Sequence, residues 1–442
     1  MPIQQMMLGA AGGYALDFNF GSVVNGLEDT NTVSTLERPR VFADRYNENR
    51  FAITFTDDDG SKRGYLRLLT RSGNTLTPSP IYDAADENQV GNMNGIFIAS
   101  GKILIHYDYN SKAWGRIITF SGSAGSESFS RSSAFQISNR AMNWEYGCQP
   151  EAVGTTGRYL IPFYNYNEHT NGSRGSDRDA YLRIVTATTS AVTHYGGGSS
   201  DGIWLQESSS SAPRVVMHPD DDTKALMCVA AHDYILVFRP LTLSGTGNSA
   251  TVSVGSRVIA CPSVSHNGVA GHGFHAGAPV MLVSCGGDKF VAFAGGAYSS
   301  HADKLVGIAF DWDGSNFSLG SPSYAPTNIS AAVSMRYKSG AVAESAPPDG
   351  TNKIGLSILF DDPINSRRPI YGISCTRNND KTLTWSDVTL LANGATSDPT
   401  SLHHWDMAVQ SDSANTCLSV WNNNLSGTNY NNLAGKLWQL GS

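Results

Sequence analysis

The sequence is poor in charged residues and contains no cluster of basic ones. Only 16% of its 442 residues are charged, and 31 Lys and Arg stand against 38 Asp and Glu, so the net charge is −7. A protein that binds nucleic acid normally presents a basic face to the phosphate backbone. We therefore expect no nucleic-acid partner.

Long apolar runs are also missing. No stretch reaches the roughly 18–20 apolar residues that a membrane-spanning helix needs, so no membrane insertion is expected. Residues 1–18 are largely apolar, but the first basic residue is Arg38. Because a secretory signal begins with a positively charged region, this N-terminus does not have the features of one.

Cysteine is scarce and lacks the spacing of redox or zinc motifs. The six cysteines are scattered without a Cys-x-x-Cys pair, and four lie in or beside apolar runs: Cys228, Cys285, Cys375 and Cys417. Such residues behave as small buried hydrophobes, and free thiols persist in a reducing compartment. We expect buried free thiols in a protein that folds in a cytoplasm, with disulfide bonds or a metal site as the alternatives.

Motifs that carry catalysis or cofactors are absent as well. There is no Gly-x-Ser-x-Gly elbow, no phosphate loop and no HEXXH helix. The densest histidine cluster, His266-x5-His272-x2-His275, has no carboxylate between its members, so metal binding is the weaker interpretation. The acidic stretches 57–60 and 220–222 lack the EF-hand alternation and are explained as turns. We predict no catalytic residues, metal or cofactor.

What the sequence does contain is a loose internal repeat. Seven segments of about 50–75 residues each open with a short apolar run, continue with strand-like runs and turn through Gly, Ser, Asn or Asp. The opening runs centre near Val41, Ile96, Val153, Val215, Val280, Val333 and Met407. One such unit is a small antiparallel sheet that cannot bury both faces alone, so copies must stack. The repeat predicts an all-β fold, a seven-bladed β-propeller.

The strand pattern is clearest in the first repeat. Runs at 40–43, 51–55, 64–69 and 76–81 are predicted as its four strands, from the innermost to the outermost. Turn residues with Gly, Asn or Asp separate them, as tight hairpins require. Equivalent third strands are predicted at 115–120, 181–185, 234–238, 305–310, 370–374 and 434–438.

The two ends of the chain complement each other. After the third strand at 434–438 the seventh repeat lacks an outer strand, whereas residues 14–21 resemble a fourth strand that precedes the first blade. We predict that this N-terminal strand completes the last blade and closes the ring. The chain then divides into a docking segment, residues 1–13, and a propeller, residues 14–442.

A candidate ligand site follows from the blade assignment. Connections between second and third strands, and those between blades, emerge on one face and carry most of the histidines and many aromatic rings. The longest between-blade connections are predicted at 195–211 and 259–277, and extended loops on a rigid scaffold often carry recognition. The predicted ligand-binding residues are Trp204, His272, Phe274, His275, Tyr298, His301 and Trp405. The alternative is that these loops face solvent or a neighbouring subunit.

One turn resembles a motif of sialidase-type propellers. Residues 378–385, Asn-Asn-Asp-Lys-Thr-Leu-Thr-Trp, are similar to their Asp-box, Ser-x-Asp-x-Gly-x-Thr-Trp. Asp380, Thr384 and Trp385 match, whereas Asn378 and Thr382 depart from the pattern. In that family the box is structural and recurs over the blades, but here it occurs once. The resemblance therefore implies a turn between third and fourth strands, and no catalytic residue is carried over.

The opening Met-Pro-Ile-Gln-Gln-Met-Met-Leu-Gly resembles the N-termini of virion proteins of tailed bacteriophages, and the turn-and-strand repeats resemble their tail and fibre propellers. The resemblance implies a structural virion protein, made in the host cytoplasm and present in multiple copies, whose propeller recognises host-surface polysaccharide. Its N-terminus would dock other virion proteins through Ile3, Met6, Met7 and Leu8. A carbohydrate-active, sialidase-like enzyme and a free lectin are the alternatives.

Overall fold

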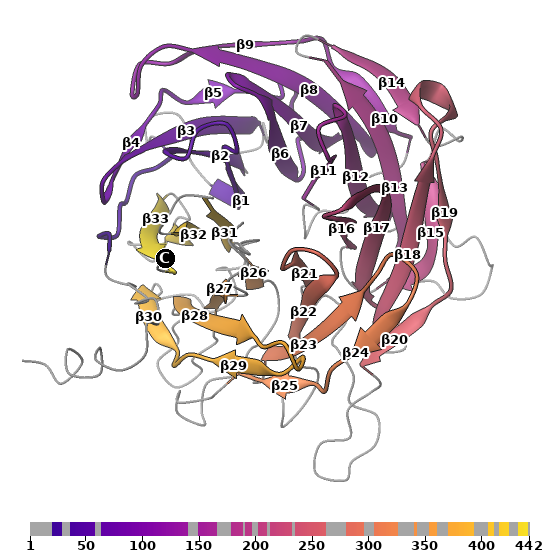
Figure 1. Cartoon of the computed structure of the whole chain (residues 1–442). Helices are drawn as coiled ribbons and strands as arrows, with labels where there is room; N and C mark the ends of the chain where they lie inside the picture. Colours follow the sequence, from indigo (N-terminus) through magenta and orange to yellow (C-terminus); the bar gives the residue numbers. More distant parts are fainter. Residues whose placement is uncertain are drawn as a thin grey trace, which may run out of the picture.

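The computed structural model shows an all-β molecule in which seven sheets are arranged as blades around a central axis (Figure 1). It describes residues 20–28, 36–57, 63–139, 149–165, 178–188, 191–196, 202–209, 213–231, 235–261, 280–295, 305–325, 340–342, 353–359, 370–392, 405–410, 415–423 and 432–440. In these ranges the helical element is one 3₁₀ turn, η2 (Gly247–Ser249). The predicted seven-bladed β-propeller is confirmed.

Each blade is an antiparallel meander that begins at the axis. The inner strands are β1 (Leu36–Ala43), β6 (Met93–Ala99), β11 (Glu151–Val153), β16 (Arg214–His218), β21 (Val280–Ser284), β26 (Gly340–Val342) and β31 (Trp405–Val409). The second strands are β2 (Arg50–Asp57), β7 (Lys102–Tyr109), β12 (Arg158–Asn165), β17 (Asp221–Ala230), β22 (Lys289–Gly295), β27 (Lys353–Leu359) and β32 (Thr416–Asn423). The third strands are β3 (Gly64–Ser72), β8 (Lys112–Ser121), β13 (Arg178–Ala187), β18 (Leu236–Ser244), β23 (Leu305–Trp312), β28 (Ile370–Arg377) and β33 (Asn432–Gln439).

These strands match the predicted repeat closely, with one difference. In six blades the inner strand includes the predicted opening residue, and each predicted third strand falls within or overlaps an observed one. In the sixth blade the described inner strand is β26, which begins at Gly340 rather than near Val333. Val333 itself lies outside the described residues.

The outer strand, in contrast, is split into two short pieces in six of the blades. The pairs are β4 (Thr75–Pro78) with β5 (Tyr82–Asp83), β9 (Ser128–Arg131) with β10 (Phe135–Ser138), β14 (Val192–Gly196) with β15 (Ile203–Ser209), β19 (Thr251–Val254) with β20 (Val258–Cys261), β24 (Phe317–Leu319) with β25 (Ser323–Tyr324), and β29 (Leu383–Trp385) with β30 (Thr389–Ala392). Both pieces of each pair bond to the same third strand.

In three blades a serine side chain bridges this split. The N–H of Leu68 donates to Ser79 Oγ at 2.9 Å, and Ser79 N–H donates back to Leu68 O at 2.8 Å. Ser132 with Ile117 and Ser386 with Ser374 repeat this exchange. The hydroxyl takes the place of a carbonyl of the outer strand, so the third strand stays hydrogen-bonded where the outer strand turns away.

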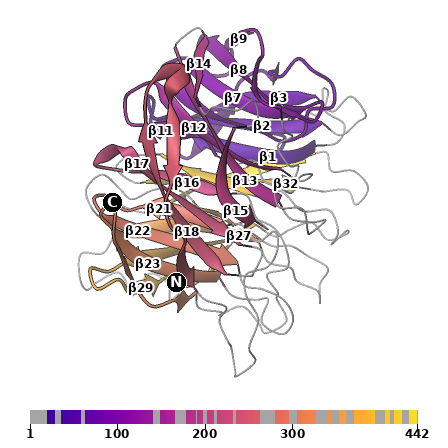
Figure 2. The same ribbon diagram turned by 90° about the vertical axis from the view of Figure 1, so that its right-hand side faces the viewer.

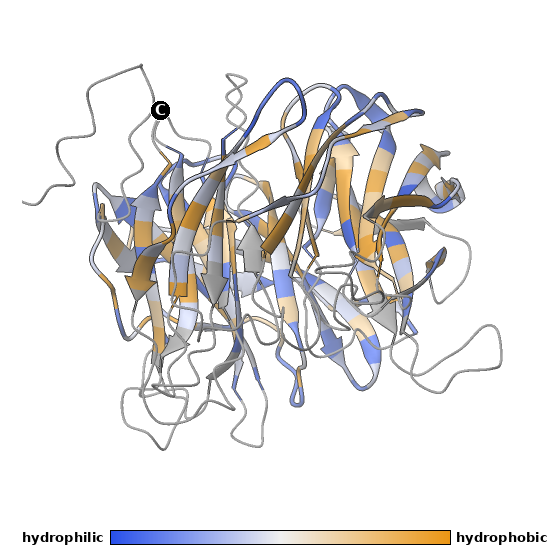
Figure 3. Cartoon of the chain, turned by 90° about the horizontal axis from the view of Figure 1, so that it is seen from below, coloured by the Kyte–Doolittle hydropathy of each residue, from blue (hydrophilic) through white to orange (hydrophobic). Residues whose placement is uncertain are grey.

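Apolar side chains of each blade pack against both neighbouring blades. On β2, Phe51, Ile53 and Phe55 pack with residues of the last blade, whereas Ala52 packs with residues of the second blade. Successive side chains of a strand point to opposite faces, so one strand contributes to two interfaces. Apolar residues accordingly concentrate in the strands and polar residues at the turns (Figure 3). Viewed from the side, the blades lie as tilted layers around the axis (Figure 2).

A cation on the third strand adds a polar link between neighbouring blades. Arg183 Nε donates to Ile137 O of the preceding blade at 2.7 Å, and Arg239 Nε donates to Glu207 Oε1 at 2.7 Å. Lys436 Nζ donates to Leu391 O in the same manner, at 3.3 Å. Arg67 lies at the corresponding position of the first blade and donates to Leu27 O at 2.7 Å. Residues 21–27 thus take the place of an outer strand for the last blade.

Main-chain hydrogen bonds confirm this closure of the ring. Gly21 N–H donates to Leu437 O, Val24 and Gly435 exchange two bonds of 2.9 Å, and Leu27 N–H donates to Leu433 O. Residues 21–27 therefore run antiparallel to β33, and Figure 1 shows the last blade beside β1 of the first. The prediction of an N-terminal closing strand is confirmed for this segment; residues 14–19 lie outside the described residues.

The cysteine prediction also holds where it can be examined. Cys228, Cys285, Cys375 and Cys417 are buried free thiols. Burial raises the pKa of the Cys285 thiol to about 12, so this thiol stays protonated and unreactive at neutral pH. Within the described part of the chain, no helix is long and apolar enough to span a membrane.

Candidate functional site

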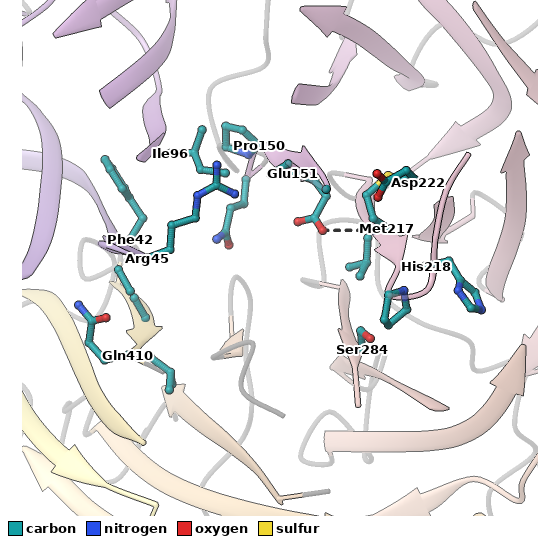
Figure 4. A pocket seen from close by; sticks show the side chains of 18 of the residues that line it. Phe42, Arg45, Ile96, Pro150, Glu151, Met217, His218, Asp222, Ser284 and Gln410 are labelled. Carbon is teal, nitrogen blue, oxygen red and sulfur yellow. Dashed lines mark hydrogen bonds between the residues drawn. The ribbon is translucent and has the colours of Figure 1, made fainter. Parts of the chain in front are cut away.

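A cavity of about 470 Å³ lies at one end of the central axis (Figure 4). The turns that join inner to second strands surround it, and these turns contribute Arg45, Gly154 and Pro219. Asp222, at the start of second strand β17, also lines it. Further lining comes from the inner strands of several blades and the residues that flank them, and includes Phe42, Ile96, Gln149, Pro150, Glu151, Met217, His218, Ser284, Met407 and Gln410. The cavity thus combines an apolar wall with a small set of polar groups, as ligand sites usually do.

Arg45 is positioned over the cavity by two tyrosines. Its Nη2 donates to Tyr46 Oη at 2.8 Å and to Tyr159 Oη at 3.4 Å, and its guanidinium lies 5.0 Å from the centre of the Tyr46 ring. Tyr46 Oη in turn donates to Ile98 O at 2.8 Å, which fixes the turn of the first blade to the second. The guanidinium is therefore held in place from one side by hydroxyls and a ring face.

Asp44 supports the turn that carries Arg45. Its Oδ1 accepts the N–H of Tyr46 at 2.9 Å, and its side chain is buried. Burial raises the pKa of the Asp44 carboxyl to about 6, against the opposing effects of the Tyr46 N–H and the Arg50 charge. Arg50 Nη1 lies 3.7 Å from Asp44 Oδ2. The carboxyl therefore acts as an internal anchor of the turn and does not line the cavity.

Several polar groups of the cavity already have protein partners. Glu151 Oε1 accepts the N–H of Met217 at 3.2 Å, the contact drawn in Figure 4. His218 Nε2 lies 3.2 Å from Trp312 O, and its Nδ1 accepts the N–H of Asp220 at 3.2 Å. Gln410 donates its amide to main-chain oxygens of the first blade, including Asn47 O at 3.4 Å. These side chains join neighbouring blades and shape the wall.

Asp222 reaches the cavity because its neighbour is a glycine. A Cβ added to Gly154 would lie 2.3 Å from Asp222 Oδ1, closer than any real contact. Gly154 also has a φ of +50°, a conformation that glycine adopts without strain. The turns of the third and fourth blades can therefore approach each other, and this approach places the Asp222 carboxylate in the lining.

Figure 4 shows how the charges are distributed. Arg45 lies on one side of the cavity with Phe42 and Ile96, and Asp222 lies on the other side beyond Glu151. No group of three or more His, Cys, Asp or Glu in the described ranges has the arrangement of a metal site. Chemically, the cavity offers guanidinium donors, carboxylate acceptors and an apolar wall for one small polar ligand or for the end of a longer one.

Two of the residues predicted as ligand-binding, Trp204 and Trp405, belong to the described part of the chain, and both lie in strands rather than loops; Trp204 does not line this cavity. Most of the predicted connection 195–211 forms strands, so Trp204 lies on β15, where it is 37% exposed and pairs with Tyr181. Trp405 is the first residue of inner strand β31 and pairs with Trp421. The prediction of a loop at 195–211 was wrong because the outer strand of this blade is split, and its second piece, β15, does not follow the regular spacing of the repeat. The other candidates lie outside the described residues, as do the docking residues: His272, Phe274, His275, Tyr298, His301, Ile3, Met6, Met7 and Leu8.

The sequence did not predict the cavity residues, because the prediction used the density of histidines and aromatic rings, which is highest in the connections assigned to the opposite face. Arg45, Gln149 and Asp222 belong to three different repeats and carry no motif. Asp222 was noticed within 220–222 but was explained as part of a turn. The available signal was positional for two of them, since Arg45 and Asp222 lie in or beside the turn between inner and second strands, whereas Gln149 precedes inner strand β11.

The Asp-box-like turn is structural, as predicted. It joins β28 to β29, and Asp380 Oδ1 accepts the N–H and hydroxyl of Thr382 at 3.1 and 2.7 Å. Trp385 donates to Ser323 Oγ at 2.9 Å and packs against Phe293 of the neighbouring blade. These contacts stabilise the turn and the interface between two blades, and none of these residues lines the cavity.

Comparison with known proteins bears on the fold alone. No protein-family model and no curated protein matches the sequence. Among solved structures, the BP39L lectin from Burkholderia pseudomallei is 10% identical, with 89% of this chain and 93% of that chain covered and a TM-score of 0.52. A putative 6-phosphogluconolactonase from Bacteroides uniformis is 13% identical, with 77% and 83% covered and a TM-score of 0.47. The NanB sialidase from Streptococcus pneumoniae is 9% identical, with 99% and 72% covered and a TM-score of 0.41. The chain is a β-propeller protein, and its structural neighbours include lectins and sialidases.

Proposed function

We propose that this propeller binds carbohydrate without cleaving it, and that the sugar occupies the axial cavity. The observation that carries the proposal is the cavity itself, where polar side chains of separate blades converge beside an apolar wall. A sugar ring has apolar faces and a rim of hydroxyls, and it is bound where apolar surface and hydrogen-bonding groups lie together. Tyr46, which is 46% exposed beside Arg45, adds a ring that a sugar face can cover.

A glycan array with the full-length protein tests this proposal. We expect binding to a defined group of glycans, with Arg45→Gln and Asp222→Asn each weakening it while the melting temperature stays close to that of the wild type. Trp204→Ala serves as the matched variant, because Trp204 is exposed on β15 away from the cavity. Binding that is lost with Trp204→Ala but kept in the cavity variants would place the site on the outer strands instead. No binding to any glycan would reject the function.

The cavity also supports a second candidate, a glycoside-cleaving enzyme, because Glu151 and Asp222 are two carboxylates in one site. Incubating the glycans found on the array with the protein and measuring new reducing ends distinguishes the two. We expect no release above background. Release that disappears in both Glu151→Gln and Asp222→Asn would replace the binding function with hydrolysis.

We further propose that the propeller belongs to the virion of a tailed bacteriophage, where it presents its cavity to polysaccharide of the host surface. The N-terminal nonapeptide supports this placement, and the absence of charge before Asp17 suits docking by apolar packing or as an added strand. The protein would be made in the host cytoplasm and assembled in multiple copies. Phage that carry a deletion of residues 2–9 should produce a folded propeller that is missing from purified particles. Normal incorporation of the truncated protein would place the anchor elsewhere.

A further inference from the structure

The polar side chains of the cavity fall into two groups, those with protein partners and those without. His218, Gln410 and Glu151 hold neighbouring blades together, as described above. For Arg45, hydrogen bonds are found for Nη2 only, so its Nε and Nη1 donors have no partner among the described residues. The carboxylate of Asp222 and the amide of Gln149 also accept and donate nothing within the described ranges, although both line the cavity.

The free donors of Arg45 are well suited to a carboxylate. Nη2 belongs to both forks of the guanidinium and is engaged by the tyrosine hydroxyls. The free Nε–H and Nη1–H groups point in different directions, and each can donate a charge-assisted hydrogen bond to a carboxylate oxygen. The opposite side of the group is occupied by the tyrosine hydroxyls, so the side chain is already oriented and loses little freedom on binding. No acidic side chain forms an ion pair with Arg45 within 4 Å in the described structure, so the positive charge is uncompensated at close range.

Charge on the other side of the cavity limits what the anion can be. Asp222 and Glu151 are carboxylates, and they would repel a ligand that carried several negative charges. They are good acceptors for the hydroxyl groups of a sugar, and the Gln149 amide can both donate and accept. A ligand with a single carboxylate and several hydroxyls therefore fits all the free groups at once.

From these observations we infer that the cavity selects acidic saccharides, with the sugar carboxylate on Arg45 and hydroxyls on Asp222 and Gln149. The inference rests on the proposed carbohydrate-binding function and adds the chemical class of the ligand. In this arrangement Arg45 provides the selectivity for acidic over neutral sugars, and Asp222 discriminates against sugars with a second charge.

Isothermal titration calorimetry on the full-length protein tests the inference. The probes are saccharides that each contain a single galacturonate, glucuronate or N-acetylneuraminate residue, each with its carboxyl-reduced neutral counterpart, together with one sulfated saccharide. At least one acidic probe should bind about tenfold or more tightly than its reduced form, as expected for a charged hydrogen-bond pair. Arg45→Gln should remove this difference, and Arg45→Lys should keep part of it because the charge remains but the tyrosine-held planar donor group is lost.

Controls separate the failure of the inference from that of the function. Arg158→Gln removes an arginine of the same face that does not line the cavity, and it should leave the preference unchanged. Equal affinity for acidic and neutral forms, or tighter binding of the sulfated saccharide, would overturn the inference while carbohydrate binding itself stands. No binding of any probe, together with a negative glycan array, would reject both. Melting curves show whether each variant folds. If Arg45→Gln does not fold, Asp222→Asn provides an independent cavity variant.

Discussion

Gly154 is the single residue on which the shape of the cavity depends most directly. It lies in the turn between β11 and β12, has a left-handed backbone and faces the Asp222 carboxylate of the next blade. A side chain at this position would have to displace either its own turn or the carboxylate. The glycine therefore links a local backbone requirement to the position of a proposed ligand group.

Replacing Gly154 by alanine should lower stability and carbohydrate affinity together. The left-handed conformation costs a non-glycine residue about 1–2 kcal/mol, and the new Cβ would also push Asp222 out of place. Gly157→Ala is a matched control, since Gly157 has a φ of +72° in the same turn but meets only Ala187 O at 3.4 Å. Chemical denaturation and glycan binding measure the two effects. If both variants bound glycan equally well, Asp222 would not be a ligand group.

His106 is a buried residue with a different role. It lies on β7 with no exposed surface, and among the described residues neither of its ring nitrogens finds a hydrogen-bond partner. Burial lowers its pKa from 6.5 to about 3, so the folded protein holds this ring neutral. Between these two pH values the unfolded chain binds a proton that the folded protein does not, and stability must fall as the pH falls through this range.

The variant His106→Leu should remove this pH dependence. Each pH unit well inside the window is worth about 1.4 kcal/mol, so between pH 7.5 and pH 5 the wild type should lose about 2 kcal/mol relative to the variant. Urea denaturation at pH 7.5, 6.5 and 5 measures the difference. The raised pKa of Asp108, to about 7 through burial, acts in both proteins and cancels in the comparison. Parallel curves for the two proteins would show that His106 is not held neutral.

At the scale of secondary-structure elements, the repeat is expressed differently in the inner and outer strands. The inner, second and third strands could be predicted because their alternating apolar residues face two blades at once, and the turns between them contain Gly, Asn or Asp. The outer strand could not, because its split depends on Ser79, Ser132 and Ser386, whose hydroxyls replace main-chain partners in the folded state. In the sequence, a serine that accepts a hydrogen bond from the third strand cannot be distinguished from any other serine of a polar turn.

The cavity was beyond prediction for a related reason. Arg45, Gln149 and Asp222 are far apart in the sequence and belong to three blades, and only the radial packing of the blades brings them to one cavity. The overall count of blades and the closure of the ring, in contrast, followed from the spacing of apolar runs and from the missing outer strand at 434–438. Regular spacing predicts the scaffold, whereas individual turn residues determine the site.

The contact between Arg239 and Glu207 tests how much the polar links between blades contribute. Arg239 donates to Glu207 Oε1, Gly255 O and Gln206 O, and Glu207 is buried. Arg239→Met should destabilise the protein by about 3–5 kcal/mol, because a buried carboxylate loses its main partner. The double variant Arg239→Met/Glu207→Met should recover much of that loss. Guanidinium denaturation of the wild type, the two single variants and the double variant gives the coupling. Additive losses would mean that the two side chains act independently.

At the scale of the whole molecule, stability depends on whether the ring is closed. Residues 21–27 provide the outer strand of the last blade, and Leu27 packs in one cluster with residues of the first and last blades. In addition, Val41 N–H of β1 donates to Asp406 Oδ2 of β31 at 2.9 Å. First and last blades are therefore joined both at the axis and at the circumference.

Val24→Pro should weaken the pairing of residues 21–27 with β33 and leave the contacts of the first and last blades at the axis in place. Proline has no N–H, so the bond from Val24 to Gly435 O is lost and the strand is displaced. We expect a loss of about 1–3 kcal/mol in the free energy of unfolding. Val23→Pro is the matched control, because Val23 is exposed and its N–H is not among the bonds to β33. Thermal unfolding compares the two, and equal melting temperatures would show that the closing strand contributes little.

The same closing strand has a consequence for how the protein is made. Leu433 lies 405 residues after Glu28, the residue whose carboxylate accepts its N–H. A ribosome that adds about 5–20 residues per second needs roughly 20–80 s between these two points. During that time residues 21–27 have no β33 to pair with, while the later blades are translated. A translation product that stops before β33 leaves the main-chain groups of Gly21, Val24 and Leu27 without their partners on that strand. The hydrogen bonds that close the ring can therefore form only after β33 has been made, which places ring closure among the last steps of folding.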